Sequence, residues 1–459
     1  MRTVQTVQGQ TVQGQAVQGQ AVQGQRPLLL VVATGMRTYR EYLLRSIRGE
    51  FDIHLFHVDE PTWEKEYISG WTVLPTTLDG PAMADAAREV HAATPVAGVL
   101  CWDEGRIHAA SYVAEALGLR NGAPDVIWRL RDKGQTREAL DAAGVAQPRS
   151  IPVRTLEEAL AAADRIGYPA ILKPRGLGAS LGVVRVDDAV QLAEKFAFTA
   201  GAQGPDPDPL PFSTDQPVLV EELVTGEEIS VDAVVRDGVV TPLFVGRKVV
   251  GYPPYAEETG HFVDGDDPLL TDPRLLDALQ DTHTALGFRD GWTHSEFMLT
   301  TDGPRLIEVN GRLGGDMIPY LGVLATGIDP GLAAARAACG IAPATTPAHH
   351  RVAGIRFFYV DHDDTRIESV AFREDELPDA VEQVVAVARP GAVVSPPPKG
   401  TVWGRIAFAI ATGDSVEACG AALDAAESAL DVRGARDDRE APDAPDADRA
   451  GDEVHAHGH

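Results

Sequence analysis

The sequence predicts a multidomain protein that combines α/β and α+β architecture, and three observations support this. At 459 residues, the chain exceeds the roughly 250 to 300 residues that one hydrophobic core usually holds. Apolar strands alternate with helical segments from Pro27 to about residue 125, which is typical of a small parallel sheet. Further along, two strands flank an Asp302-Gly303 turn, which indicates an antiparallel hairpin.

The composition excludes several classes of protein. With 40 Lys and Arg against 68 Asp and Glu, the formal net charge is -28, whereas a nucleic-acid or membrane binder needs a concentrated basic surface. No apolar run approaches the ~20 residues that span a bilayer, and no signal-peptide pattern opens the chain. Three scattered cysteines suggest no disulfide framework. We therefore expect a cytoplasmic protein without nucleic-acid or membrane partners.

Both ends of the chain differ in composition from the rest. Residues 1–25 repeat a T/A-V-Q-G-Q pentapeptide, too short in period for a solenoid and too poor in apolar residues for a core, so we expect a disordered arm. Residues 435–459 are rich in Asp, Pro and Ala, so we expect a disordered acidic tail. His455, His457 and His459 could hold a metal, but chance histidines in a polar terminus are the favoured interpretation.

Four segments are expected between these ends. They are the parallel α/β domain at 26–125, a small lobe with a glycine-rich lid at 126–216, a large lobe at 217–349, and a C-terminal α+β subdomain at 350–434. The Pro/Gly/Asp-rich stretch GAQGPDPDPLPFSTDQP marks the boundary between the two lobes.

A glycine-rich hairpin follows an apolar strand in YPAILKPRGLGASLGV. The strand delivers Lys173 into a loop with three glycines and Ser180, where small residues let backbone N–H groups approach a phosphate and the ammonium adds charge. The lysine precedes the glycines, so this is not a Walker loop. A plain β-turn explains the loop equally well when it is considered alone.

A second polar segment, VLVEELVTGEEISVD, leads from an apolar strand to Glu221, Glu222, Val224 and Glu228. An acid that accepts from an adenine amino group, a backbone segment at the ring edge and an acid for the ribose hydroxyls would satisfy the polar rim of a nucleoside. Surface acids are the alternative, and they would be preferred if the segment stood alone.

The hairpin formed by WTHSEFML and PRLIEVNGR carries a third polar group. We expect residue 298 to pair with 306, so that Glu296 lies opposite Glu308 and shares a face with Asn310. Two opposed carboxylates repel unless a cation lies between them. Hard oxygen ligands of this kind suit Mg²⁺, and the alternative is a solvated hairpin face.

In this order, the elements resemble the ATP-grasp superfamily from about Pro27 to Val432. More closely, DKGQTR, EETGH, THSE and EVNGRLGGDMIP are similar to the carboxylate-amine ligases of the L-amino-acid α-ligase branch, which make dipeptides. The resemblance implies an ATP-grasp fold with an N-terminal Rossmann-like pre-ATP-grasp domain. It also implies ATP and Mg²⁺ as cofactors and amino acids or related carboxylates and amines as substrates; a homodimer is left open.

The resemblance and the motifs together assign roles to individual residues. The expected ATP site comprises Lys133, Lys173, Ser180, Glu221, Glu222, Val224, Glu228 and Lys248. The expected Mg²⁺ ligands are Glu296, Glu308 and Asn310, and the expected substrate contacts are Glu258, His261, Gly315 and Asp316. Two positions depart from the pattern of relatives. Arg175 stands where many have a small or polar residue, and Asp316 either favours a cationic or polar substrate or, as the favoured interpretation, caps the following helix.

Glu308, Asn310 and Arg312 form a row of polar residues spaced two apart, and Arg312 is the expected catalytic group. Two residues beyond Asn310, its guanidinium could bind the acylphosphate and the oxyanion that forms when an amine attacks; an ordinary salt bridge is the alternative. The implied reaction joins two L-amino acids and releases ADP and phosphate. The alternatives are an ATP-grasp ligase for a carboxylate that is not an α-amino acid, and a nucleotide-binding subunit without ligase activity.

Overall fold

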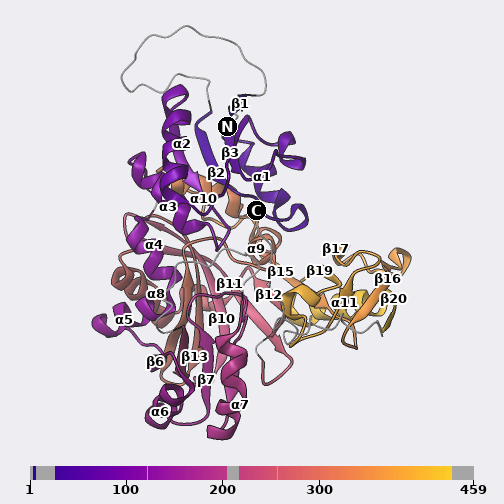
Figure 1. Cartoon of the computed structure of the whole chain (residues 1–459). Helices are drawn as coiled ribbons and strands as arrows, with labels where there is room; N and C mark the ends of the chain where they lie inside the picture. The colour runs from indigo at the N-terminus through magenta and orange to yellow at the C-terminus, as the bar shows by residue number, and fades with distance from the viewer. Residues whose placement is uncertain (1–3, 7–25, 121, 204–216, 256, 437–459) are drawn as a thin grey trace, which may run out of the picture.

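The structure, a computed structural model, confirms the mixed α/β and α+β class. It describes residues 4–6, 26–120, 122–203, 217–255 and 257–436. Figure 1 shows the N-terminal domain at the top, the small lobe with α6 and α7 at the bottom, and the C-terminal region beside the large sheet.

The N-terminal domain is built on a five-stranded sheet in the order β1-β4-β3-β2-β5. Its elements are β1 (Val4–Thr6), β2 (Leu28–Val32), α1 (Arg37–Ile47), β3 (Asp52–His57), β4 (Gly70–Val73), α2 (Gly80–Ala93), β5 (Val96–Leu100) and α3 (Ile107–Ala116). Strands β2 to β5 are parallel, as expected. The short β1 pairs antiparallel with β4, so residues 4–6 differ from the expected disordered arm. The remaining repeat lies outside the described residues.

Two helices connect this domain to the rest. They are α4 (Pro124–Arg131) and α5 (Lys133–Ala143). Ile127, Leu130 and Leu140 on these helices pack with Ile229 and Leu279 of the large lobe. Although they fall in the segment expected to form the small lobe, these helices therefore cover the large sheet.

The small lobe is a four-stranded sheet in the order β6-β9-β7-β8. Its elements are β6 (Ser150–Val153), α6 (Leu156–Ile166), β7 (Ala170–Pro174), β8 (Val184–Val186), α7 (Ala189–Ala200) and β9 (Val218–Glu222). Strand β9 pairs with both β6 and β7. The expected boundary at residue 216 therefore separates β9 from the sheet to which it belongs.

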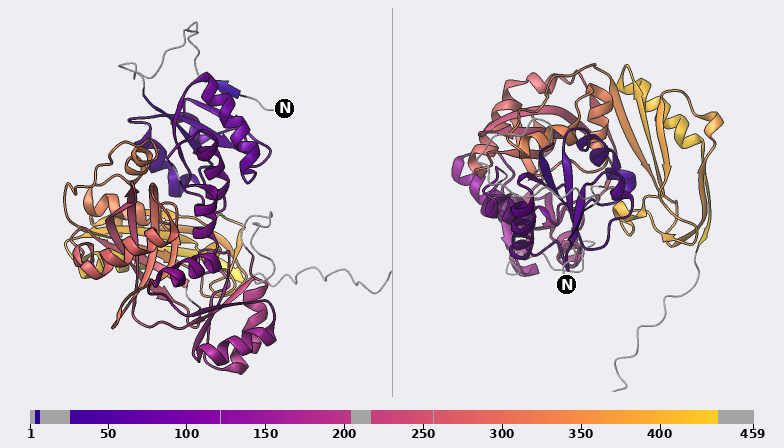
Figure 2. Two further views of the ribbon diagram at one scale, coloured as in Figure 1. Left: turned by 90° about the vertical axis from the view of Figure 1, so that its left-hand side faces the viewer. Right: turned by 90° about the horizontal axis from the view of Figure 1, so that it is seen from above.

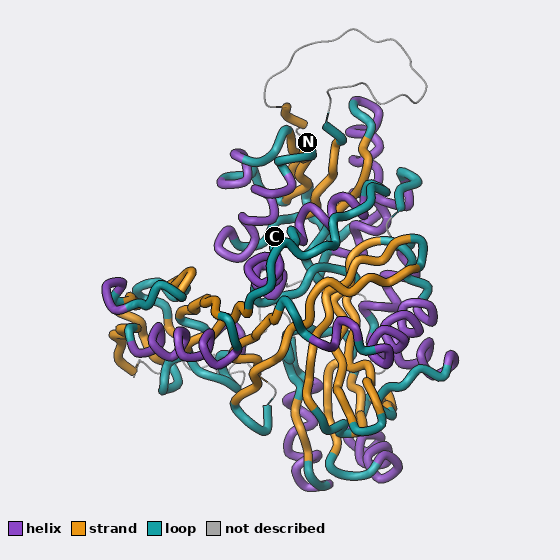
Figure 3. The backbone as a smooth tube through the Cα atoms, turned by 180° about the vertical axis from the view of Figure 1, so that it is seen from behind, coloured by secondary structure: helices purple, strands orange, loops and turns teal. Residues whose placement is uncertain are grey.

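The large sheet has eight strands in the order β14-β13-β10-β11-β12-β15-β19-β17, and its long antiparallel strands are seen from behind in Figure 3. The elements of the large lobe are β10 (Glu227–Arg236), β11 (Val239–Gly251), β12 (Glu257–Asp264), α8 (Pro273–Leu286), β13 (Gly291–Thr300), β14 (Gly303–Asn310), α9 (Ile318–Thr326) and α10 (Pro330–Ala338). Helices α4, α5 and α8 cover one face, and α9 and α10 cover part of the other.

The hairpin of β13 and β14 has the expected register at its functional end. Glu296 pairs with Glu308. Between this pair and the turn the register shifts by one residue, so that residue 298 pairs with Arg305 instead of 306. The shift leaves Ile307 without a pairing partner in the ladder. This β-bulge adds one residue to β14, so the predicted pairing is wrong near the turn and right at the carboxylates.

The C-terminal region extends the large sheet and adds a small one. Its elements are β15 (Val352–Phe358), β16 (Thr365–Phe372), β17 (Val381–Ala386), β18 (Val393–Val394), β19 (Ala407–Gly413), α11 (Val416–Ser428) and β20 (Leu430–Arg436). Strands β18, β16 and β20 form a separate sheet, which stands to one side of the N-terminal domain in the right-hand view of Figure 2. Residues 435 and 436 thus belong to β20 and not to a tail; the rest of the expected tail, with its histidines, lies outside the described residues.

Within the described ranges, no single helix has the length and apolar character needed to cross a membrane. Helices α9 and α10 would meet both criteria only when taken together, and they are bent by 107° relative to each other.

Candidate active site

Two lysines meet where the small lobe faces the large sheet. Lys173 lies on β7, and Lys133 is the first residue of α5. The Lys133 ammonium lies 3.1 Å from Glu308 Oε1 and donates to the carbonyl oxygen of Leu177 at 2.6 Å. It therefore links β14 to the glycine-rich loop, in which Ser180 has a left-handed backbone with φ of 54°.

Arg175, at the start of this loop, has a structural partner. Its guanidinium forms a buried ion pair with Asp132, whose side chain caps α5. A Cβ atom on Gly134 would lie 2.6 Å from the guanidinium carbon, so a larger residue there would displace the Arg175 side chain. The pair fastens the loop to the start of the helix that carries Lys133.

Glu221 is engaged by two cations. Its carboxylate lies 2.6 Å from Lys173 Nζ and 2.8 Å from Arg137 Nε. Burial raises its pKa, but Arg137 and Lys173 together lower that pKa to about 2. Because both oxygens already accept from cations, a role in holding Lys173 is favoured over direct contact with adenine. Glu222, by contrast, is partly exposed, and Val224 is buried nearby.

Lys248 lies at the centre of an acidic cluster. Its buried ammonium donates to Glu228 at 2.8 Å, Glu258 at 2.9 Å and Glu296 at 2.8 Å. Burial opposes the charge, but the three carboxylates raise the pKa of Lys248 well above its ordinary value. An ammonium has three donors, so contact with a triphosphate would require one carboxylate to be displaced.

The expected metal ligands lie on neighbouring strands. Glu296 and Glu308 are paired across the hairpin, and each carries a lysine partner, Lys248 and Lys133. The Asn310 amide is oriented so that its nitrogen donates to carboxylates. That nitrogen lies 3.1 Å from Glu104 Oε1 and 3.3 Å from Glu308 Oε1. Carboxylate and amide oxygens of this kind can ligate Mg²⁺.

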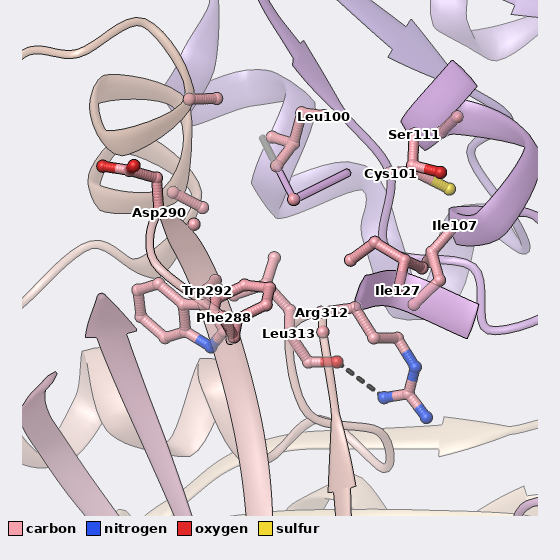
Figure 4. A pocket seen from close by; sticks show the side chains of 16 residues that line it. Leu100, Cys101, Ile107, Ser111, Ile127, Phe288, Asp290, Trp292, Arg312 and Leu313 are labelled. Carbon is pink, nitrogen blue, oxygen red and sulfur yellow. Dashed lines mark hydrogen bonds between the residues drawn. The ribbon is translucent and has the colours of Figure 1, made fainter. Parts of the chain in front are cut away.

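Arg312 is fixed by an acid from the N-terminal domain. Its Nε donates to Glu104, which also accepts from Arg131, and its NH1 donates to the carbonyl oxygen of Leu313 at 2.7 Å. Figure 4 shows this last bond beside a cavity at the boundary between the N-terminal domain and the large lobe. The salt-bridge alternative is thus present, but the acid comes from a different domain and not from the neighbouring Glu308.

The buried carboxylate of Asp232 connects the glycine turn at Gly314 to His294 on β13. Asp232 accepts from Trp292 Nε1 at 2.8 Å, from the backbone N–H of Gly314 at 3.0 Å and from His294 Nδ1 at 2.9 Å. His294 Nε2 lies 3.6 Å from Glu296. A Cβ on Gly314 would lie 2.8 Å from His294 Nδ1, so only glycine fits this close approach.

Asp316 does not cap a helix, contrary to the favoured interpretation. Helix α9 begins at Ile318 after Met317, and no side chain caps it. The Asp316 carboxylate instead forms two bonds with Arg405, at 2.6 and 2.9 Å, and lies 3.3 Å from His261 Nε2. His261 lies equally close to Glu258, so three of the expected substrate contacts do come together; Gly315 leaves open space beside them.

Sequence reasoning missed four residues that hold this arrangement. They are Glu104, Arg137, Asp232 and Arg405. Glu104 follows the predicted strand AGVLCW, and its position after that strand was the available signal. The other three lie in a helix, in a strand or before a strand without a local motif, so their partners could be found only from the fold.

Comparison with known proteins identifies similar sequences. A family described as an ATP-grasp domain matches residues 166–320. Alanine–anticapsin ligase of Bacillus subtilis is 29% identical over 45% of this chain and 46% of its own. D-alanine–D-alanine ligase of Pseudomonas fluorescens is 27% identical over 43% of this chain and 59% of its own. The chain thus spans about half the length of the curated relatives it matches.

The fold is also found in solved structures. An L-amino acid ligase from Bacillus licheniformis superposes with a TM-score of 0.72 at 22% identity, over 89% of this chain and 99% of the other. The resemblance inferred from the motifs is therefore confirmed, as is the expected fold. Residues 166–320 thus match an ATP-grasp domain, and the chain as a whole is similar in sequence or fold to ATP-dependent amino-acid ligases.

Proposed function

We propose that this chain is an ATP-dependent carboxylate-amine ligase that joins two L-amino acids through an acylphosphate and releases ADP and phosphate. The observation that supports this most is the row Glu308, Asn310 and Arg312 at the end of β14, which lies opposite Glu296 and beside Lys133. The related alanine–anticapsin and D-alanine–D-alanine ligases, by their names, act on amino acids, which favours substrates of this class here.

The donor set of the hairpin fits Mg²⁺. Glu296, Glu308 and Asn310 offer hard oxygens, and both carboxylates already attract an ammonium group. When bound, Mg²⁺ would supply positive charge that neutralises the phosphates during transfer.

In the first step, a carboxylate oxygen attacks the γ-phosphorus of ATP, and the bond to the bridging oxygen breaks to release ADP. Lys173 on β7 of the small lobe and Lys133 at the start of α5 would hold the phosphates in line for transfer. Lys248 holds Glu228, Glu258 and Glu296 together. It would reach the triphosphate only by giving up one of these acids.

In the second step, the amine nitrogen attacks the acyl carbon, an oxyanion forms, and phosphate leaves as the amide is completed. Arg312 would stabilise this oxyanion, because Glu104 fixes its guanidinium before the substrate arrives. The glycine-rich loop with Ser180 would act as a lid and exclude water, which would otherwise hydrolyse the acylphosphate.

The remaining residues surround the two organic ligands. Glu222, Val224 and Glu228 would border the nucleoside, while Glu221 holds Lys173. Glu258, His261, Gly315 and Asp316 would border the amino acids. Because Asp316 is already neutralised by Arg405, it would shape the pocket and would not select a cationic substrate.

A screen of phosphate release tests the proposal. The protein is incubated with ATP, Mg²⁺ and pairs of L-amino acids, and products are identified by mass spectrometry. We expect ADP, phosphate and a dipeptide for at least one pair. AMP and pyrophosphate would reject the mechanism, amide formation only with other carboxylates would favour the broader ligase, and no product from any mixture would favour a nucleotide-binding subunit.

A further inference from the structure

Arg40 of helix α1 lies beside the glycine turn that follows Arg312. Its NH1 donates a long hydrogen bond of 3.4 Å to the carbonyl oxygen of Gly314, and the residue is half-buried. Helix α1 thereby brings a cation from the N-terminal domain to the glycine turn, whereas Lys173 comes from the small lobe and Lys133 from the start of α5.

Other cations of the site have carboxylate partners within ion-pair distance. Lys133 pairs with Glu308, Lys173 with Glu221, Lys248 with Glu296, Arg312 with Glu104, and Arg405 with Asp316. Across the described residues, Arg40 has no carboxylate within the 4.0 Å that defines such a pair. A guanidinium carries five N–H donors, so most of those of Arg40 are free to bind an anion.

Asp316 and Asp103, the two carboxylates whose charges favour the protonated form of Arg40, are paired with other arginines. Asp316 holds Arg405 through both oxygens, and Asp103 lies 3.0 Å from Arg106. Burial lowers the pKa of Arg40, and repulsion from Arg312 lowers it further. Two guanidinium groups near each other, one of them without an acid, form an environment that a bound anion would stabilise.

We propose that Arg40 binds the carboxylate of the amine substrate, the carboxylate that does not react and that becomes the C-terminus of the product. This assignment rests on the proposed function. The amine substrate would therefore be an amino acid with a free carboxylate, and a simple amine or an amino acid amide would be a poor substrate.

The reacting carboxylate is a less suitable ligand for Arg40. It must lie next to the γ-phosphate, on the side of Lys133, Lys173 and the carboxylates of β13 and β14. It also loses its charge as a carboxylate once the acylphosphate forms. The carboxylate of the amine substrate keeps its charge throughout, so it needs a permanent cation outside the phosphate site, and Arg40 fits that position.

The main experiment compares free and amidated amine substrates. Initial rates are measured for wild type and Arg40→Ala with L-alanine, L-leucine or L-phenylalanine as the amine substrate, and with the three corresponding amides. In wild type, we expect a KM about 10- to 100-fold higher for the amide, as typical for the loss of a charged hydrogen bond. Arg40→Ala should raise the KM of the free amino acid by a similar factor and leave that of the amide unchanged.

Two further measurements separate this role from others. Arg40→Lys should restore part of the affinity for the free amino acid, because the charge remains. Arg37→Ala, on the same helix and paired with Glu41 on the surface, should behave as wild type. The KM for ATP should be unchanged in each variant.

The alternative ligands give different results. If Arg40 bound the reacting carboxylate, Arg40→Ala would slow positional isotope exchange within ATP, which reports acylphosphate formation without an amine; this would overturn the proposal. Equal losses with free and amidated substrates would also overturn it. A wild type that forms no amide would instead refute the proposed function, so the two failures are distinguishable.

Discussion

The two halves of the polar row at the end of β14 are built differently. Glu308 meets Glu296 within one hairpin, where register alone brings them together. Arg312 is held by Glu104, 208 residues away, and Asp316 is held by Arg405, 89 residues away. The carboxylate pair of the expected metal site is therefore a local structure, whereas the positions of Arg312 and Asp316 depend on the docking of three regions. A change on the first side should affect chemistry directly, whereas a change on the second should act through the position of Arg312.

The largest expected effect tests the local half. Glu308→Gln keeps the shape of the side chain and removes its charge, so it should lower kcat on the order of 10³-fold, because charge stabilisation by a metal is worth several kcal/mol. A Mg²⁺ titration of phosphate release should shift to higher concentrations, while the melting temperature changes little. Glu227→Gln, an exposed acid on β10, is the control. Full activity with an unchanged titration would reject the metal role.

The next effect tests the non-local half. Arg312→Ala should lower kcat by about 10² to 10³-fold, as for the loss of an oxyanion donor, with little change in the KM for ATP. Arg312→Lys should recover little activity, because an ammonium does not replace the fixed donors of a planar guanidinium. Arg305→Ala, on β14 before Arg312 and paired with Glu222 at 3.4 Å, should be close to wild type. Turnover within a few-fold of wild type in Arg312→Ala would leave only a structural salt bridge.

These two halves also show how far a sequence can lead. The hairpin, the opposed carboxylates and the parallel N-terminal domain were predictable, because period and turn residues act over short distances. The partners Glu104 and Arg405 were not, because they come from other domains and share no motif with the residues they hold. The helix-cap prediction for Asp316 was wrong for the same reason. Its local sequence suited a cap, but a distant guanidinium offered two charged hydrogen bonds.

Asp232 allows a test of the connection between the halves. Asp232→Asn keeps the size of the side chain but weakens its hold on both Gly314 and His294. We expect kcat to fall about 10- to 100-fold, as is common when a residue that orients metal ligands is changed. The activity should also depend less steeply on the Mg²⁺ concentration. Trp292→Phe removes only one donor to Asp232 and should cost much less activity. Equal losses in the two variants would indicate a general packing defect rather than a positioning role.

The phosphate side should also respond to pH through Lys173. Burial lowers the pKa of Lys173 to about 8 even though Glu221 opposes the shift. Only the protonated ammonium attracts phosphate, so kcat/KM for ATP should fall as pH rises above about 8, approaching ~10-fold per pH unit for one proton. Lys173→Arg stays charged and should move this decline to higher pH. A flat profile between pH 7 and 9.5 in wild type would contradict the assignment.

The smallest effect concerns the chain ends, which we expect to contribute to neither half of the site. A chain from Arg26 to Arg436 should keep its turnover, and its melting temperature should change by no more than a few degrees, because it loses only the three-residue edge strand β1 among the described elements. A chain that stops at Gly434 should melt slightly lower, because Ala435 and Arg436 pair with Arg366 and Thr365 on β16. Both should turn over ATP equally, since β20 lies in the separate small sheet. A loss of turnover in the longer chain would mean that the repeats or the acidic tail take part in catalysis, and the site would then extend beyond the two halves compared above.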